Sequence, residues 1–150
     1  MTQSKTLRRW ELALLLGVAL AALLGVWLDG AQAALSDRVI RLHVLANSDS
    51  EADQALKLRV RDAVLAEAEE LFVPGAGRAE TEELLRAHLY DLAAAGAEVV
   101  GEAGYSYPVT ASLVHDYWFP PKTYTDFALP AGAYTALRIE IGAGGGQNWW

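Results

Sequence analysis

One segment, from Val39 to Asp62, constrains the fold most, because it contains a strand, a turn and a helix without interruption. Apolar and polar residues alternate from Ile40 to Val44, which is the period-two pattern of a strand. The pattern ends at Asn47, where Asn, Ser and Asp side chains favour turn dihedrals. Ser50 then occupies the N-cap position of a helix with two acidic residues in its first turn. The segment therefore predicts a strand that leads directly into a helix.

The helix predicted over residues 51–72 has two apolar rows, which indicates that it packs against two neighbours. At about 100° per residue, one row holds Leu56, Val60, Ala63, Val64 and Leu71, and the other holds Leu58, Leu65 and Phe72. Lys57 and Arg61 project between the rows, so we expect their stems to be covered. Asp53 precedes Lys57 by four residues, the orientation that favours an ion pair. We expect a covered Asp53–Lys57 pair, with an ordinary surface pair as the alternative.

A second helix and two more strands follow. Apolar residues recur at intervals of three and four from Leu84 to Leu92, and Gly96 is predicted to be the C-cap glycine of this helix. Alternation over residues 109–113 and 137–141 predicts two further strands. The predicted fold class is therefore α+β: a small mixed or antiparallel sheet of about three strands with two helices packed on one face, after an N-terminal signal or transmembrane helix.

The N-terminus carries an apolar run of 17 residues, 12–28, preceded by three basic residues. This arrangement keeps the N-terminus in the cytoplasm and exports the remainder of the chain. The run is slightly long for a signal peptide and short for a membrane span of about 20 residues. A small-x-small pattern of the kind that signal peptidase requires ends at Ala33. We expect residues 1–33 to be a signal peptide or an uncleaved membrane anchor, and residues 34–150 to form a single exported domain.

Charge and cysteine content exclude several classes of function. Removing the two acidic and three basic residues of the leader from totals of 19 and 12 leaves 17 and 9, a net charge of −8. Such acidity argues against nucleic acid and against anionic lipid as the main partner, so we expect the membrane to be reached only through the N-terminal segment. The chain has no cysteine, which removes disulfides, thiol nucleophiles and thiolate metal sites.

No catalytic or metal-binding motif is complete. The residues from Asn47 begin like a calcium loop, but the sixth position is Ala52 and the twelfth is Leu58. The glycine-rich run, residues 142–147, lacks the helix or the lysine that a phosphate loop requires, so it is expected to be a flexible exit. There is no G-x-S-x-G or HExxH pattern, although a carboxylate pair that meets only in space stays open. We expect no catalytic residue, no metal and no cofactor.

Residues 117–126 combine aromatic side chains with two prolines, which predicts an extended loop. Tyr and Trp suit protein interfaces because they bury much area and keep a polar group. The alternative is that these rings close the bottom of a small core. Lys122 and Asp126 flank Tyr124 and are predicted to be rim charges that set specificity.

Several segments resemble the family of stage II sporulation protein R of endospore-forming bacteria. The resemblance rests on HVLANSDSEADQALKLRVRDAVL from His43, YPVT from Tyr107, FPPKTYTDFALPAGAYTALRIEIG from Phe119 and the final GQNWW, which are in the family's order and approximate spacing. Family members continue beyond this final tryptophan, so the chain is expected to be truncated at its C-terminus.

The resemblance implies signalling and no enzymatic activity. Proteins of this family are made in the forespore and secreted into the space between the forespore and mother-cell membranes. There they trigger a membrane-embedded aspartic protease of the mother cell to cleave pro-sigma-E. The expected partner is therefore the extracytoplasmic face of that protease. The competing interpretations are an exported peptidoglycan hydrolase and a structural spore-envelope protein.

From the residues and the resemblance together we predict a partner-binding surface in two parts. One part is the polar turn with the covered positions of the following helix, and the other is the aromatic loop. The predicted residues are Asn47, Ser48, Asp49, Asp53, Lys57, Arg61, Lys122, Tyr124 and Asp126.

Overall fold

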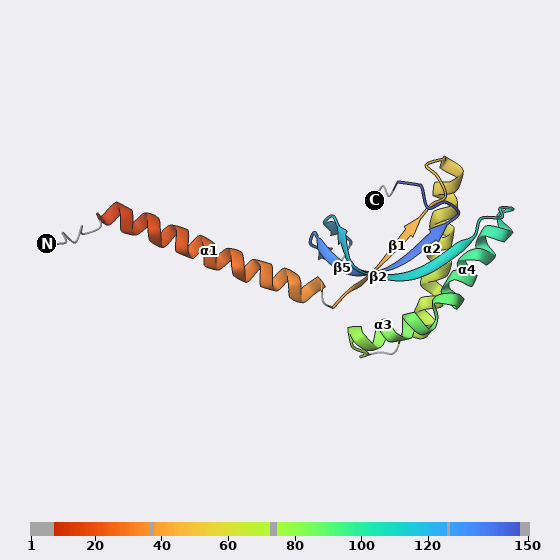
Figure 1. Cartoon of the computed structure of the whole chain (residues 1–150), viewed down its shortest axis with the longest axis horizontal. Helices are drawn as coiled ribbons and strands as arrows, with labels where there is room; N and C mark the ends of the chain where they lie inside the picture. The colour runs from red at the N-terminus through yellow and green to blue at the C-terminus, as the bar shows by residue number, and fades with distance from the viewer. Residues whose placement is uncertain (1–7, 37, 73–74, 126, 148–150) are drawn as a thin grey trace. The chain divides into compact units, whose positions relative to one another are not determined.

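The chain consists of two compact units, Met1–Leu35 and Ser36–Trp150, which are described separately. Figure 1 traces their helices and strands. The computed structural model describes residues 8–36, 38–72, 75–125 and 127–147. One predicted site residue, Asp126, therefore lies outside the described residues.

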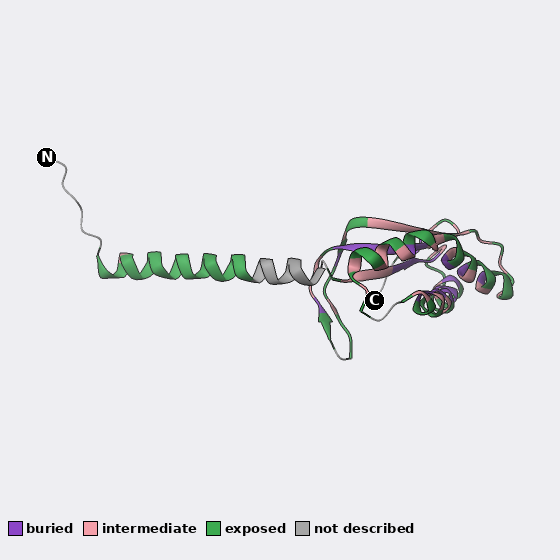
Figure 2. Cartoon of the chain, turned by 90° about the horizontal axis from the view of Figure 1, so that it is seen from below, coloured by how far each residue is buried: buried purple, intermediate pink, exposed green. Residues whose placement is uncertain are grey.

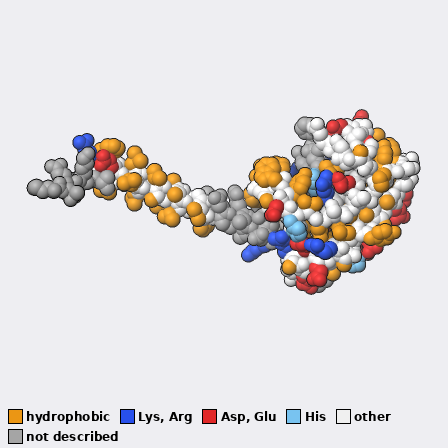
Figure 3. All heavy atoms as spheres, viewed as in Figure 1, with side chains coloured by type: hydrophobic (Ala, Val, Ile, Leu, Met, Phe, Trp, Pro, Cys, Tyr) orange, Lys and Arg blue, Asp and Glu red, His pale blue; other side chains and the backbone are white. Residues whose placement is uncertain are grey.

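The first unit is built on one apolar helix, α1 (Arg9–Ser36). Its stretch Arg9–Trp27 has 19 residues and a mean hydropathy of 2.0, and none of that stretch is buried. The exposed surface of this stretch appears green in Figure 2, and Figure 3 shows hydrophobic side chains along the visible face. By length and composition such a helix can cross a membrane. The helix is therefore compatible with both predicted roles, a signal sequence and a membrane anchor.

The second unit contains a three-stranded mixed sheet. Its strands are β1 (Ile40–Leu45), β2 (Val109–Phe119) and β5 (Gly132–Ile141), in the spatial order β1-β5-β2. The central β5 pairs parallel with β1 and antiparallel with β2. Two short strands, β3 (Lys122–Thr123) and β4 (Ala128–Leu129), form a separate antiparallel ribbon. The predicted α+β class with a small mixed sheet is confirmed.

The prediction of a loop over residues 117–126 is wrong in part, because β2 continues to Phe119 and β3 begins at Lys122. Pro120 and Pro121 occupy the corner between these strands. A proline there removes no hydrogen bond from either ladder, so the two prolines mark a corner and do not mark a loop.

Three helices lie between β1 and β2 in the chain: α2 (Glu51–Leu71), α3 (Arg78–Ala87) and α4 (Leu89–Glu102). The predicted N-cap is confirmed, because the Ser50 hydroxyl accepts a hydrogen bond from the amide of Asp53 at 3.1 Å. The second predicted helix is divided at His88, whose backbone leaves the helical region.

Gly96 is not the C-cap that the sequence predicts. It lies inside α4, where a Cβ would meet Val109 at 3.1 Å and Val60 at 3.2 Å. The glycine therefore allows α4 to approach α2 and β2 closely. The helix ends later, and Gly104, with φ of +82°, supplies the left-handed residue after its C-cap.

The main core lies between one face of the sheet and the helices. Alternate residues of β5, Leu137, Ile139 and Ile141, meet apolar residues of all three helices there. Figure 2 shows the buried stretches of the second unit in purple. The core residues are Val44, Leu56, Val60, Val64, Ala68, Leu85, Leu92, Val100, Leu137, Ile139 and Ile141. The first apolar row of α2 thus packs in the main core, as predicted. Leu58, Leu65 and Phe72 of the second row are 41 to 52% exposed.

A smaller aromatic core lies on the opposite face of the sheet, and a β-bulge creates it. The register of β2 shifts between Val114 and Tyr117, with Asp116 at φ of +56°. Before the bulge, Leu113 packs into the main core, and after it Tyr117 packs beside Phe119 and Tyr134 on the other face. Because of the extra residue, the odd-numbered side chains of β2 face the main core before the bulge and the aromatic core after it.

Candidate functional site

The polar turn, residues 47–50, is held together by one carboxylate. Asp53 of α2 accepts hydrogen bonds from Asn47 Nδ2 at 3.0 Å and from Ser48 Oγ at 2.6 Å. Its side chain is only 4% exposed. These hydrogen bonds, from Ser48 first and then from Asn47, lower the pKa of Asp53, and burial opposes them. The turn is therefore closed around an ionised Asp53 at neutral pH.

The glycine-rich run packs onto this turn, so the prediction of a flexible exit is wrong. The amide of Ala143 donates to Asn47 Oδ1 at 3.0 Å, and the amide of Gly146 donates to the carbonyl of Ala46 at 3.0 Å. A Cβ on Gly146 would lie 2.7 Å from the carbonyl oxygen of Ser48. Glycine is therefore required here by close backbone approach, which a sequence pattern shared with mobile loops does not reveal.

Lys57 lies in the interior beside this turn and is 4% exposed. Burial lowers its pKa, and the charge of Asp49 partly restores it. Asp49 also accepts a hydrogen bond from the amide of Gln147, at 2.5 Å. The turn, the start of α2 and the glycine-rich run therefore form one polar network. Four of the predicted binding residues, Asn47, Ser48, Asp49 and Asp53, make hydrogen bonds inside this network.

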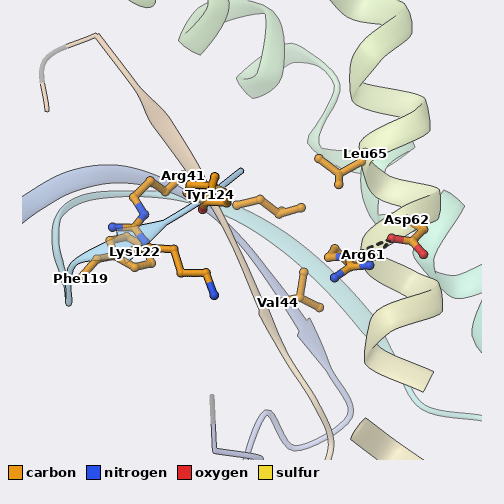
Figure 4. Close-up of a pocket in the computed structure, with 9 residues that line it drawn as sticks. Arg41, Val44, Arg61, Asp62, Leu65, Phe119, Lys122 and Tyr124 are labelled. Atoms are coloured by element: carbon orange, nitrogen blue, oxygen red, sulfur yellow. Dashed lines mark hydrogen bonds and ion pairs between the residues drawn. The ribbon is translucent and has the colours of Figure 1, made fainter. Parts of the chain in front are cut away.

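Three other predicted binding residues meet elsewhere, in a groove of about 420 Å³ along β1. In Figure 4 the side chains from α2, Arg61 among them, lie on one side of β1, and Lys122 lies on the other. Tyr124 also lines the groove. The described residues that line it, called the groove below, are Arg41, Leu42, Val44, Arg61, Asp62, Leu65, Phe119, Lys122 and Tyr124.

The groove is basic, although the domain is acidic. Arg41, Arg61 and Lys122 are three of the nine basic residues after the leader. Among the described residues of the groove, Asp62 is the one carboxylate, and Arg61 contacts it at 2.6 and 2.8 Å. Within the described part of the chain, Lys122 forms no ion pair. The lining therefore keeps an excess of positive charge.

Aromatic rings hold one cation of the groove, Arg41, in position. The guanidinium of Arg41 lies 4.1 Å from the centre of the Phe119 ring, and its Nη1 donates to the carbonyl of Pro120 at 3.4 Å. Tyr124 stacks on Phe127 with ring centres 4.7 Å apart, and both rings are more than 40% exposed. Sequence reasoning found Tyr124 but missed Arg41, whose polar position in an alternating strand is typical of an ordinary solvent-facing residue.

His43 lies beneath this region in the aromatic core and is 2% exposed. Its ring centre is 4.8 Å from that of Tyr117 and 5.6 Å from that of Phe119. Burial, and then the charges of Arg138, Lys57 and Arg41, lower the pKa of His43 to about 4. His43 is therefore neutral at physiological pH.

A line of polar groups that sequence reasoning missed connects α3 to the sheet. His115 Nε2 lies 3.3 Å from Glu82 Oε1, and His115 Nδ1 lies 3.3 Å from Thr135 Oγ1. The order resembles that of a nucleophile, a base and an orienting acid. However, Thr135 is 3% exposed, and its hydroxyl accepts a hydrogen bond from Arg78 at 2.8 Å. No substrate can reach that hydroxyl, so this line ties α3 to β5 and is not a hydrolytic site.

The side chains that the structure describes include no group of three or more His, Cys, Asp or Glu residues placed to hold a metal ion. The groove chemistry is instead that of recognition, because the groove combines three cations with the exposed ring of Tyr124 and apolar walls. It lies on the surface of the second unit and is formed by residues far apart in the sequence.

Comparison with known proteins gives a family for the chain. Residues 36–150 match the family model described as Stage II sporulation protein R (spore_II_R). The stage II sporulation protein R of Bacillus subtilis (strain 168) is 35% identical over 116 residues, which cover 77% of this chain and 51% of that relative. The chain thus spans about half the length of the curated relative. No solved structure matches it. Because the model covers most of its length, the chain belongs to the stage II sporulation protein R family.

Proposed function

We propose that this chain is an exported signalling protein of endospore formation that activates a membrane-embedded aspartic protease of the mother cell. The activated protease then cleaves pro-sigma-E. The family and the apolar α1 support export during sporulation. The chain would act in the space between the forespore and mother-cell membranes, either released or held there by α1.

The observation that carries the proposal is the groove. A signalling protein without catalysis needs a surface that recognises one partner, and recognition surfaces combine aromatic anchors with arginine. The groove brings Arg61, Lys122 and Tyr124 together from two distant parts of the chain. It is therefore the surface that we assign to the extracytoplasmic face of the protease.

Activation by contact requires that the chain bind the active arrangement of the protease more tightly than the inactive one. A hundredfold preference corresponds to about 2.7 kcal/mol. Two or three interface side chains supply that difference, since single anchoring residues contribute about 2 kcal/mol or more.

The test is reconstitution in a bacterium that does not sporulate. The host carries the protease, pro-sigma-E and a complete exported copy of the protein, and cleavage is followed by immunoblot. Cleavage should require the exported copy and should be lost when the leader is deleted. The double variant Arg61→Gln/Lys122→Gln and the single variant Tyr124→Ala should each reduce cleavage at least about tenfold.

The matched control is Arg59→Gln. Arg59 lies on the same helix as Arg61, loses the same single charge that Arg61→Gln loses, and contacts Glu102 at 3.8 Å outside the groove. It should leave cleavage unchanged. If pro-sigma-E is cleaved normally in the presence of the double variant, and that variant is exported in normal amount, the groove is not the surface that activates the protease.

A further inference from the structure

The outer edge of β1 is open. β1 is an edge strand, and among the described residues only β5 pairs with it. The backbone groups of an edge strand that point away from its partner are available for another strand. Three residues of this strand, Arg41, Leu42 and Val44, also line the groove. The groove therefore runs beside an unpaired row of backbone donors and acceptors.

A strand that paired with this edge of β1 would present side chains to both walls of the groove. Side chains of an added strand alternate between the two faces of the sheet. On the helix side they would meet Arg61 and Leu65 of α2, and on the other side they would meet Arg41 and Lys122. Each side thus offers a cation, and apolar surface lies next to it. A volume of about 420 Å³ falls within the range of about 300 to 1,000 Å³ that ligand pockets have.

The charge of the groove selects the kind of strand. The described residues of the groove include three cations and one carboxylate, which Arg61 contacts, so they leave a positive surface in a domain whose net charge is −8. A second copy of this acidic domain is therefore a poor match for the whole surface, whereas a short acidic segment is a good one. Lipid headgroups and free phosphate would use the cations but not the backbone edge.

We propose that the groove binds an acidic segment of its partner in extended conformation, which adds to the sheet as a strand beside β1. This inference rests on the docking role proposed above and adds the chemistry of the partner. Backbone hydrogen bonds to β1 supply affinity that does not depend on sequence. Carboxylates on the segment contact Arg41, Arg61 and Lys122, and its apolar side chains contact the exposed Leu65 and Tyr124.

The test uses the full-length chain in micelles of an uncharged detergent, labelled with ¹⁵N. The probe is a short blocked peptide of alternating glutamate and valine. Its addition should shift the amide signals of Ile40 to Leu45, and the affinity should fall as salt is raised. The variant Arg61→Gln/Lys122→Gln should weaken binding about tenfold, and Arg59→Gln should not.

Two control peptides separate backbone pairing from simple charge attraction. The first replaces glutamate by lysine, and the second keeps glutamate but carries methyl groups on its backbone nitrogens. Both should bind at least about tenfold more weakly. Equal binding of the methylated peptide, or shifts confined to the polar turn, would overturn the proposal. Broadening of the β1 signals that grows with protein concentration in the absence of peptide would also overturn it, since a second copy would then occupy the edge.

The peptide assay and the cleavage assay fail independently. If Arg61→Gln/Lys122→Gln abolishes cleavage but the acidic peptide does not bind β1, the docking role stands and the added strand is wrong. If the peptide binds β1 but pro-sigma-E is cleaved normally in the presence of the same variant, the strand edge is a binding site and its proposed role in activation is wrong.

Discussion

The polar turn and the groove contain similar side chains but use them in opposite ways. In the turn, Asn47 and Ser48 donate to a buried Asp53, so polar groups are satisfied inside the molecule. In the groove, Arg41 rests on an aromatic ring, and Lys122 forms no ion pair with any described residue. The polar groups of the turn therefore stabilise the fold, whereas the positive charges of the groove are accessible to a binding partner. A binding role for the turn residues stays a prediction.

The comparison is tested most strongly by removing the centre of the turn. Asp53→Ala leaves Asn47 and Ser48 without their acceptor, and hydrogen bonds to a charged group are worth about 1.5 to 3 kcal/mol each. We expect a loss of about 4 kcal/mol in the free energy of unfolding, measured by urea titration followed by near-UV circular dichroism. The isosteric Asp53→Asn should cost about half as much. A loss below about 1 kcal/mol for the alanine variant would mean that the turn does not hold the fold.

As the pH falls, acid should weaken first the aromatic core around His43 and then the polar turn around Asp53. His43 has a folded pKa of about 4, below its unfolded value of about 6.5, so the unfolded state binds the proton first as the pH falls. Stability should therefore decrease between about pH 6.5 and 4, by about 3 kcal/mol in total.

The lowered pKa of Asp53 acts in a different window. Its stabilisation is present above the unfolded pKa of about 3.9 and is lost as the pH falls below that value. Urea titrations at a series of pH values should resolve the two phases. His43→Phe should flatten the first phase alone, and a first phase that persists in this variant would assign it to another group.

A smaller loss is expected where the glycine-rich run meets the turn. Gly146→Ala places a Cβ 2.7 Å from the Ser48 carbonyl and should cost about 2 kcal/mol. The control is Gly101→Ala in α4, where a Cβ meets no atom within 4 Å. That substitution should be neutral or stabilising by about 0.5 kcal/mol because alanine favours the helix. Equal effects of the two substitutions would show that the run does not press against the turn.

The smallest effect on stability belongs to the groove. Arg61→Gln and Lys122→Gln should each change the free energy of unfolding by less than about 0.5 kcal/mol, because exposed ion pairs contribute little. The same urea titration measures this change. Destabilisation comparable with that of Asp53→Ala would remove the distinction between the two regions.

The sequence was sufficient for several local features, although Gly96 shows that a local signal can also mislead. Ser50 caps α2 through an amide three residues away, and the alternation of β1 lies within one short run. It was insufficient where partners are distant in the chain. Asn47 meets Ala143, and Thr135 meets Arg78 and His115, and no pattern within a window of residues contains such contacts. The sequence pattern also does not reveal the bulge at Asp116, because the alternation before the bulge predicts the wrong face for the residues after it.

The candidate site shows the same division. Tyr124 and Lys122 were found from residue types that favour interfaces, and Arg61 from its position between two apolar rows. Arg41 and the open edge of β1 were missed, because strand order decides whether a strand has an open edge. Strand order depends on pairing between residues about 95 positions apart, such as Ile40 with Thr135.

The position of β5 at the centre of the sheet also determines the order in which the domain can fold. Both β1 and β2 precede β5 in the chain, and each of them pairs only with β5 in the described sheet. During synthesis, therefore, no hydrogen bond of this sheet forms until residues 132–141 have emerged, although the helices between β1 and β2 form earlier. If the chain crosses a membrane as an extended polypeptide, as proposed above, its sheet can assemble only after residues 132–141 have reached the far side.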